Sequence, residues 1–363
     1  MRRIGAISIL SWGMLPLAAT GAQAADFYQG KTLNMMINYQ AGGPADFEGR
    51  IIGHHLGKHI PGNPPIVVRN MGGAGGAVGT NWLGQVAAPD GLTFGSLTGI
   101  ASKAATGDPS VKIDLTSLEF VATGVGTSVV YARTDIPPGL KKPVDLLKAS
   151  NFWSGGLTAD SGKDLQLRMQ LDLLGLKYRY VTGYAGTAEA RLAFERSEIQ
   201  VYAESLPTYK GLIDPTFVKT GKALPIWYDS IEDPDSTAKN PDVDGIDADP
   251  FPKFYRDVMG KPGSGQLWDA LEVVGDMSGT YLRLVAMPPG TPKVAVDTLK
   301  QAFIALAKDP EFHAEAMNAM KFVPNYVVND RVEREFKEKL RMDPALRKFV
   351  QDYIEKGKQI TGK

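Results

Sequence analysis

The chain has 363 residues, of which 43% are hydrophobic and 22% charged, with 40 basic residues, 40 acidic residues and no cysteine. This composition is that of a globular protein long enough for two lobes, and it excludes disordered and fibrous chains. The balanced charge excludes a nucleic-acid binder that relies on overall basicity, and the lack of cysteine excludes disulfides, thiolate metal sites and a cysteine nucleophile.

The first residues are typical of a secretory signal peptide. Met1 to Arg3 is a basic start, the stretch 4–19 is mostly apolar, and 22–24 has the sequence A-Q-A of a cleavage signal. The apolar run is shorter than the ~20 residues that a membrane span needs, so a membrane anchor is the weaker interpretation. We therefore expect a signal peptide over 1–24 and a periplasmic mature chain.

The next elements predict parallel βαβ units. An apolar run at 33–39 leads through a glycine loop into a helix over 47–59. A second run, 66–68, leads through RNMGGAGGAVGT at 69–80 into another helix, and a third strand is expected at 92–97. Strand, loop, helix and strand in succession indicate a parallel α/β arrangement.

The second part of the chain repeats this plan. Strand character at 120–133, 151–153 and 178–182 alternates with glycine-containing loops and short helices. The acidic, proline-rich stretch 231–250 indicates a long surface loop, and the sequence after 288 is largely helical. We expect two α/β lobes, with the chain returning to the first lobe after the second. The expected boundaries are 25–124 and 232–363 for lobe 1, and 125–231 for lobe 2.

Two glycine loops, 41–43 and 73–76, predict an anion site. In parallel α/β sheets, ligands bind at the carboxyl ends of strands, where backbone N–H groups and the positive end of the helix dipole gather. Glycine lets the backbone approach a ligand closely and adopt positive φ. The spacing G-x-G-x-x-x-G is one residue off the dinucleotide fingerprint and no G-K-[ST] follows it. Taken alone, the loops are equally compatible with tight turns.

Several ordered motifs resemble the periplasmic solute-binding proteins of the tripartite tricarboxylate transporter family. The family patterns P-x-A-G-G-x-x-D, V-x-N-x-x-G-A-G-G-x-x-G and A-A-P-D-G-x-T are similar to 33–46, 67–76 and 87–93. Its patterns Y-K-G-[GST], D-N-L-P and V-A-P-A-G-T-P are similar to 184–187, 204–207 and 285–292. The resemblance covers nearly the whole mature chain. It departs at Gln40, at Ala185 and in an added segment between Pro250 and Tyr281.

This resemblance implies a fold and a function. The fold is a two-lobed α/β periplasmic-binding-protein fold of the Venus-flytrap kind, each lobe a mostly parallel sheet flanked by helices. The function is capture of a small organic acid (a dicarboxylate, tricarboxylate or aromatic acid) by lobe closure, with delivery to a membrane permease. No cofactor, metal or catalysis is implied, and the protein is expected to be a monomer that binds no nucleic acid.

Two alternatives remain open: a secreted α/β enzyme for a phosphorylated or carboxylated substrate, and a periplasmic sensor module. The enzyme is disfavoured because the chain has no G-x-S-x-G nucleophile elbow and Glu204 has no recognisable partner base.

The resemblance also carries over a set of ligand-binding residues, with main-chain groups prominent on the first lobe. On that lobe they are Gly42, Gly43, Asp46, Gly75, Gly76, Ala77, Thr98 and Gly99. On the second lobe they are Thr127, Ser161, Gly162, Tyr184, Gly186 and Thr187. Asp46 is equally compatible with complementing a helix dipole. Lys163 is a candidate partner for a second carboxylate, and Trp153 for an aromatic ring, although solvated and core roles fit them at least as well.

Two further patterns suggest metals without completing a site. His54, His55 and His59 form H-H-x-x-x-H, but no glutamate gives H-E-x-x-H and the only other histidine is His313, so a polar helix face is the preferred interpretation. Residues 240–245 resemble the start of a calcium loop whose twelfth position is phenylalanine, so a turn is preferred there.

Overall fold

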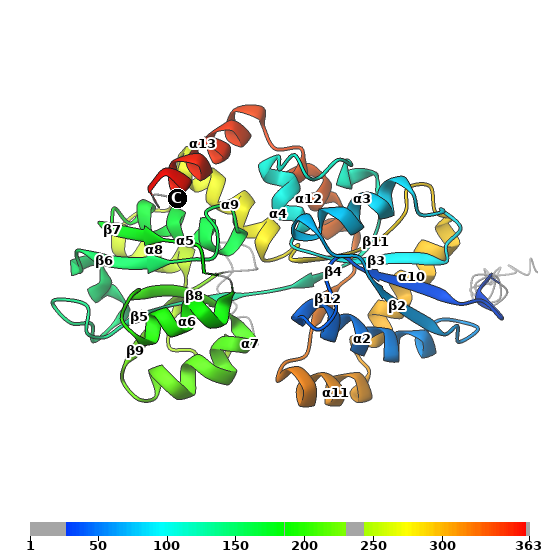
Figure 1. Ribbon diagram of the computed structural model, residues 1–363, viewed down its shortest axis with the longest axis horizontal. Coiled ribbons are helices and arrows are strands. Elements are labelled where there is room, and N and C mark those ends of the chain that lie inside the picture. Colours follow the sequence, from blue (N-terminus) through cyan, green and yellow to red (C-terminus); the bar gives the residue numbers. More distant parts are fainter. Residues whose placement is uncertain (1–26, 185, 230–242, 361–363) are drawn as a thin grey trace, which may run out of the picture.

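A computed structural model describes residues 27–184, 186–229 and 243–360. The expected signal peptide, Ala185 and most of the acidic loop, including the start of the calcium-like run, lie outside the described residues. Two six-stranded sheets, each with helices packed around it, lie side by side and are joined by an extended segment (Figure 1). The protein therefore has the two α/β lobes that the sequence predicts.

The first sheet is mixed, with strand order β12-β4-β11-β3-β1-β2. Its strands are β1 (Leu33–Ile37), β2 (Ile66–Asn70), β3 (Thr93–Thr98), β4 (Glu119–Val125), β11 (Arg283–Met287) and β12 (Asn325–Val327). β1 pairs in parallel with β2 and β3, whereas β11 pairs antiparallel with β3 and β4. The chain leaves the first sheet at the carboxyl end of β4 and re-enters it at the same end of the sheet, so β11 runs antiparallel to β4. This return makes the sheet mixed, where mostly parallel was expected.

Helices cover both faces of the first sheet. They are α2 (Pro44–Leu56), α3 (Ala77–Gln85), α4 (Ile100–Thr106), α10 (Lys293–Leu306), α11 (Pro310–Met320) and α12 (Asp330–Leu340). Met35 faces a core shared with α2, α10 and α11, and Met36 faces one shared with α3, α4 and α12. Successive side chains of β1 thus enter different cores, which explains why this strand is apolar throughout.

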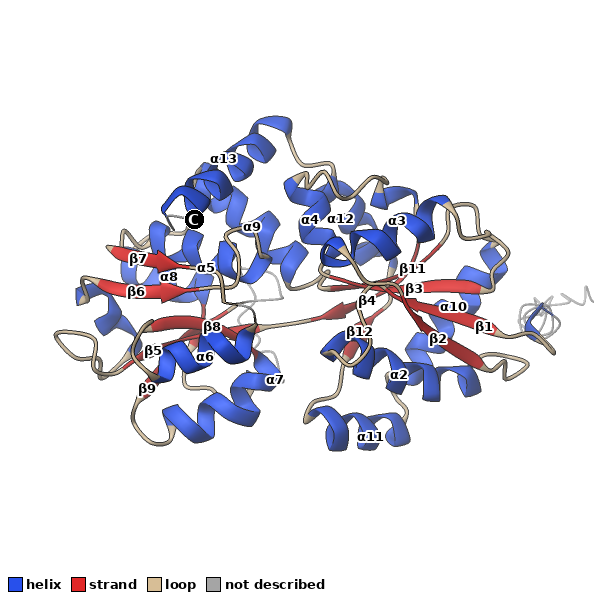
Figure 2. Ribbon diagram, in the orientation of Figure 1, coloured by secondary structure: helices blue, strands red, loops and turns tan. Residues whose placement is uncertain are grey.

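The second sheet is also mixed, with order β10-β9-β5-β8-β6-β7 (Figure 2). Its strands are β5 (Ser128–Arg133), β6 (Phe152–Gly155), β7 (Tyr178–Val181), β8 (Val201–Ser205), β9 (Ala223–Tyr228) and β10 (Asp249–Pro250). β6 pairs in parallel with β7 and β8, while β5 is antiparallel to β8 and β9. The stretch 120–133, expected as one strand region, therefore forms two strands, β4 and β5, in different sheets.

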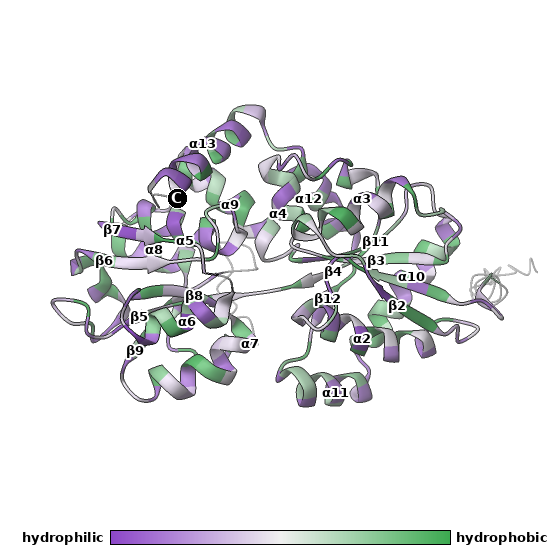
Figure 3. Ribbon diagram, in the orientation of Figure 1, coloured by the Kyte–Doolittle hydropathy of each residue, from purple (hydrophilic) through white to green (hydrophobic). Residues whose placement is uncertain are grey.

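The remaining helices pack on the second sheet. They are α5 (Gly162–Leu173), α6 (Thr187–Glu195), α7 (Leu206–Thr208), a π-helix (Tyr209–Val218), α8 (Phe251–Met259), α9 (Gln266–Ser278) and α13 (Pro344–Ile360). Figure 3 shows hydrophilic and hydrophobic residues alternating along α13, as in a helix with one buried face. None of the described helices combines the length and the apolar composition that crossing a bilayer requires.

The packing departs from the expected lobe boundary at 231/232. β10 pairs with β9, and Leu271 of α9 and Ile354 of α13 lie in the core of the second sheet. Trp227 of β9 contacts the Phe251 ring edge-on, with the ring centroids 5.2 Å apart. Because aromatic burial of this kind contributes strongly to a core, α8, most of α9 and α13 lie with the second lobe, whereas Met277 at the end of α9 lies in a core of the first. The segment expected as an addition, 250–281, supplies α8 and α9.

The lobes are connected through neighbouring crossovers. The chain leaves the first lobe after β4 through Gly126 and returns to β11 through 279–282, and the Gly126 amide donates to the Gly279 carbonyl at 3.0 Å. A Cβ atom on Gly126 would lie 2.4 Å from Leu282 Cδ2, so a larger residue would require the Leu282 side chain to move. A third connection, 341–343, joins α12 to α13.

Candidate ligand-binding site

The carboxyl ends of the parallel strands in both sheets lie at the crossovers. Thr98, at the end of β3, is in register with Arg283, which is in register with Gly124 just before the first crossover. Ser205, at the end of β8, is in register with Ser128 just after that crossover. The loops after β1, β2 and β3 therefore lie on the side of the first sheet that faces the loops after β6, β7 and β8, which is where open α/β sheets bind ligands.

The first glycine loop is held in place by Asp46. The buried Asp46 carboxylate accepts the Gly42 amide at 2.8 Å and the Asn70 side chain at 2.9 Å, and Arg50 Nε lies 3.0 Å from it. Burial alone would raise the pKa of Asp46, but the contacts from Arg50, Gly42 and Asn70 hold the pKa below its usual value. Since both oxygens are engaged, Asp46 shapes the loop. The ligand contact that we considered for it is the weaker interpretation.

The second glycine loop is unusual in its backbone. Gly73, Gly75 and Gly76 have φ of 135°, 61° and 94°, and Ala74 has 49°. Gly43 and Gly76 precede α2 and α3 without any side-chain cap, and Ala77 is the first residue of α3. The Gly42, Gly76 and Ala77 amides already donate to Asp46, Gly73 and Ala74. An anion at these two helix N-termini would therefore be held by the remaining backbone amides.

A residue that the sequence interpretation missed, Asn38, ties these loops together. The fully buried Asn38 side chain donates to the Thr98 carbonyl at 3.1 Å and the Gly76 carbonyl at 3.4 Å. It also accepts the Thr98 amide at 2.8 Å. The only available signal was a single amide side chain following an apolar strand immediately before a glycine loop.

Tyr39 and Lys103 lie next to Gly75 of the second glycine loop. The Tyr39 hydroxyl donates to the Gly75 carbonyl at 3.5 Å, and burial raises the pKa of Tyr39 while nearby Lys103 opposes this shift. A Cβ atom on Gly75 would lie 2.6 Å from Lys103 Cε. Gly99 begins α4 with φ of 69°, but its amide already donates to Leu282 at 2.8 Å. Gly99 therefore contributes to the wall and does not offer its amide to a ligand.

On the second lobe, Ser161 and Gly162 begin α5. The Ser161 hydroxyl donates to the fully buried Asp164 at 2.8 Å, and burial raises the pKa of Asp164 despite this bond. A Cβ atom on Gly162 would lie 2.0 Å from the Ser278 hydroxyl and 3.0 Å from that of Ser102. Gly162 thus allows α5 to pack closely against α9 and α4, a structural role that the sequence did not reveal.

The other predicted second-lobe residues occupy the same edge. Tyr184, Gly186 and Thr187 follow β7, Gly186 precedes α6 without a side-chain cap, and a Cβ on Gly186 would meet nothing within 4 Å. Burial raises the pKa of the half-buried Tyr184. Thr127 lies at the crossover, and its buried hydroxyl has no hydrogen-bond partner in the described part of the chain.

Three charged groups lie near the end of β8 and the start of α5: Lys163 and Glu204, both considered in the sequence, and Arg191, which the sequence interpretation missed. Lys163 Nζ lies 3.3 Å from the Tyr202 hydroxyl and 4.5 Å from the Tyr202 ring centroid. Arg191 of α6 donates to the buried Glu204 at 2.7 Å. Among residues 27–184, 186–229 and 243–360, no carboxylate forms an ion pair with Lys163. Its charge acts on Asp164 and Asp229 without forming an ion pair with either of them.

Asp229, at the end of β9, is expected to make stability fall with rising pH. Burial raises its pKa to about 7, against a hydrogen bond from Gln170 and the charge of Lys163. The unfolded carboxyl ionises near pH 4, so between about pH 4 and 7 the folded state holds an extra proton and the free energy of unfolding falls, by a few kcal/mol at most. Urea unfolding from pH 5 to 8 tests this. The stability of Asp229→Asn relative to the wild type should increase as the pH rises from 5 to 8. A difference between variant and wild type that does not change with pH would contradict this prediction.

A cavity in the second lobe lies away from the glycine loops. This cavity of about 300 Å³ is lined by residues of the second lobe that include Asp135, Asn151, Trp153 and Gln200. Trp153 is near the start of β6, so the cavity opens at the edge opposite the carboxyl ends. Arg179 lies over the Trp153 ring at 5.1 Å from the centroid. Trp153 is therefore placed away from the candidate site, and the ligand-stacking role considered for it does not apply.

The two lobes and the loops between them form the same fold as solved two-lobed periplasmic binding proteins. A TctC solute-binding protein from Polaromonas has this fold, with a TM-score of 0.65, 18% identity and coverage of 91% of this chain and 99% of that one. MatC from Rhodopseudomonas palustris, solved with bound malate, gives a TM-score of 0.53 and 18% identity over 92% of this chain and 99% of its own.

At the sequence level, a UPF0065 protein of Agrobacterium vitis is 30% identical over 178 residues, which are 47% of this chain and 49% of that protein. The chain spans about half the length, or less, of the curated relatives it matches. No known family profile matches it. These similarities agree with the resemblance noted in the sequence.

Proposed function

We propose that this protein is a periplasmic solute-binding protein of the tripartite tricarboxylate transporter family. It captures a small organic carboxylate and presents it to a membrane permease. The observation that carries the proposal is the pair of glycine loops at the ends of β1 and β2, whose helices begin without side-chain caps. Such backbone N–H groups bind one carboxylate without any catalytic group.

Lobe closure completes the binding. A ligand that contacts both lobes stabilises the closed form by its differential affinity for that form. The paired crossovers at Gly126 and Gly279 are where the backbone dihedrals can change while each sheet stays intact. The permease then recognises the closed, loaded form.

The charge at the second lobe favours a dicarboxylate. One carboxylate binds the glycine loops and the other pairs with Lys163, which has no carboxylate partner among the described residues. MatC, a protein with this fold, was solved with malate, and another from the same organism with adipate. Both ligands carry two carboxylates, which supports the same class here.

A thermal-shift and calorimetric screen of the mature chain tests the proposal. Linear dicarboxylates, matched monocarboxylates, citrate-like acids, aromatic acids and phosphorylated sugars are compared. At 100 times its dissociation constant, a ligand adds ~2.7 kcal/mol to stability, and we expect this for a dicarboxylate. A response to phosphorylated sugars alone would overturn the carboxylate assignment.

The Lys163→Met variant tests the second contact. Losing a hydrogen bond to a charged group costs ~1.5–3 kcal/mol, so dicarboxylate affinity should fall by about tenfold or more while monocarboxylate affinity stays constant. Lys177→Met is the control, because exposed Lys177 precedes β7 at the opposite edge of the sheet.

A further experiment distinguishes binding from the enzymatic alternative. After incubation with the protein, NMR should show the ligand chemically unchanged.

A further inference from the structure

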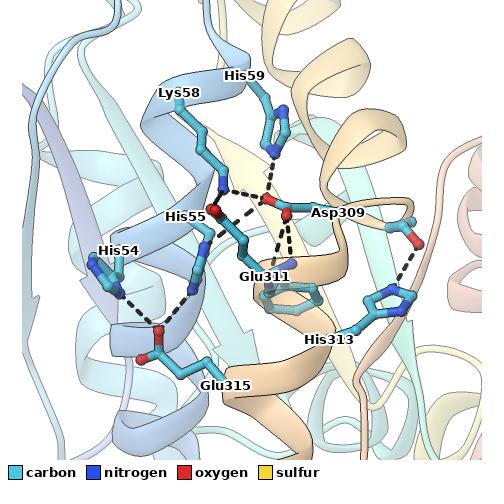
Figure 4. Close-up of polar contacts among 10 residues, drawn as sticks. His54, His55, Lys58, His59, Asp309, Glu311, His313 and Glu315 are labelled. Carbon is cyan, nitrogen blue, oxygen red and sulfur yellow. Dashed lines mark hydrogen bonds and ion pairs between the residues drawn. The ribbon is translucent and has the colours of Figure 1, made fainter.

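Far from the carboxylate site, a cluster of histidines and carboxylates joins α2 to α11 (Figure 4). The α2 side contributes the last turn of the helix and the 3-10 turn Gly57–His59 that follows it, and the α11 side contributes the start of that helix. The members of this cluster are His54, His55, Lys58, His59, Asp309, Glu311 and Glu315.

Three ligand atoms converge at the exposed edge of the cluster. Glu315 Oε2 lies 2.9 Å from His54 Nδ1 and 2.7 Å from His55 Nε2, and all three atoms lie within 4.8 Å of one another. Two imidazole nitrogens and a carboxylate oxygen are a ligand set that Zn²⁺ prefers, with a water in the fourth position. We propose that His54, His55 and Glu315 bind a divalent transition-metal ion such as Zn²⁺.

A second combination of side chains is already occupied by the protein itself. His55, Asp309 and Glu311 also have ligand atoms within 4.8 Å of one another. However, Lys58 Nζ lies 2.7 Å from Asp309 and 2.5 Å from Glu311, so an ammonium group fills the position between those carboxylates. The metal therefore binds on the Glu315 side.

Asp309 lies next to the proposed site, between His55 and His59. Its buried carboxylate is 3.9 Å from His55 Nδ1, on the side of the ring opposite Glu315, and 2.9 Å from His59 Nε2. It also accepts the Glu311 amide at 2.9 Å as the N-cap of α11. Asp309 is thus fixed beside the Nδ1 edge of His55, at a separation too long for a hydrogen bond, and Nε2 is the ring nitrogen that lies next to Glu315.

Charge and exposure also favour a dication. With neutral imidazoles, the three carboxylates of the cluster oppose a single lysine, which leaves an excess of two negative charges. Tetrahedral bonds of ~2.0–2.1 Å place ligand atoms about 3.3 Å apart, slightly wider than the present contacts. The His54 and Glu315 side chains are 70% and 40% exposed, so they can open by this amount and admit an ion from solution.

Metal binding would cross-link two helices of the first lobe that are far apart in the sequence. His55 and Glu315 are separated by 260 positions in the chain, and α2 begins at the first glycine loop. The ion would stabilise the packing of α2 against α11. This inference is independent of the proposed carboxylate binding.

The test uses tag-free mature protein treated with EDTA and titrated with ZnCl₂ by calorimetry. We expect one ion per chain and a higher melting temperature. Glu315→Gln and His54→Ala should each weaken zinc binding by about tenfold or more. Loss of a residue that only supports a ligand already costs about 10–100-fold, and loss of a ligand should cost at least as much. Glu311→Gln is the matched control: it removes the same charge from the cluster but no proposed metal ligand, so it should weaken binding much less than Glu315→Gln.

Two results would overturn the assignment. One is the lack of saturable zinc binding; the other is loss of binding in Glu311→Gln together with retention in Glu315→Gln. Since His54 is mostly exposed, His54→Ala should keep the wild-type melting temperature without metal. The absorption spectrum of bound Co²⁺, expected only with an intact site, reports ligand geometry separately from stability.

Discussion

Gly76→Ala should destabilise the first lobe and abolish ligand binding. Gly76 has φ of +94°, and an added Cβ would lie 2.3 Å from Asn38 Nδ2. The unfavourable backbone conformation costs ~1–3 kcal/mol, and displacing Asn38 leaves buried polar groups unpaired at a further ~1–3 kcal/mol. We expect a total of about 2–6 kcal/mol in urea unfolding, with no carboxylate binding detected by calorimetry.

Neighbouring glycines separate these two causes. Gly42 has φ of +86° but open space around a Cβ, so Gly42→Ala should show the backbone cost alone. Gly43 has φ of −94° and only the Gln40 carbonyl at 3.9 Å, so Gly43→Ala should be nearly neutral for stability. Equal effects at positions 42 and 76 would mean that contact with Asn38 does not determine the loop.

The sequence predicted those features that depend on local pattern. Apolar runs followed by glycine loops located β1, β2 and β3, because an alternating fold requires that order. The expected lobe boundary at 124/125 lies next to the observed crossover between β4 and β5. The strand pattern alone did not divide 120–133, since both strands are apolar and only Gly126 and Thr127 interrupt one continuous run.

The site was predictable only where its geometry is carried by the backbone. The glycine loops could be located, but the partners of Asp46 and Asn38 depend on which strands become neighbours. The histidine cluster shows the same limit more strongly, because Glu315 lies 260 positions from His55. The local pattern H-H-x-x-x-H suggested His55 with His59, whereas the fold pairs His55 with His54 around Glu315.

The buried Arg191–Glu204 ion pair gives the second large effect. Arg191 and Glu204 side chains are 19% and 2% exposed, and their contact is 2.7 Å. Arg191→Ala leaves the Glu204 carboxylate buried without its counter-ion, and breaking such a pair costs ~3–5 kcal/mol. We expect that loss in urea unfolding of the whole chain, with weaker carboxylate binding because β8 ends at the candidate site.

A second substitution shows whether the uncompensated charge is the cause. In the Arg191→Ala background, Glu204→Gln removes the charge but keeps the shape, so it should restore a large part of the lost stability. The surface pair of Lys348 with Asp352, 73% and 64% exposed, is the control, and Lys348→Ala should cost less than ~1 kcal/mol. If Glu204→Gln restored no stability, the loss in Arg191→Ala would come mainly from the packing of the arginine side chain. The Glu204 carboxylate could then remain buried without a counter-ion at little cost. Restoration would instead identify Glu204 as a charge that the second lobe can bury only while Arg191 is bound to it.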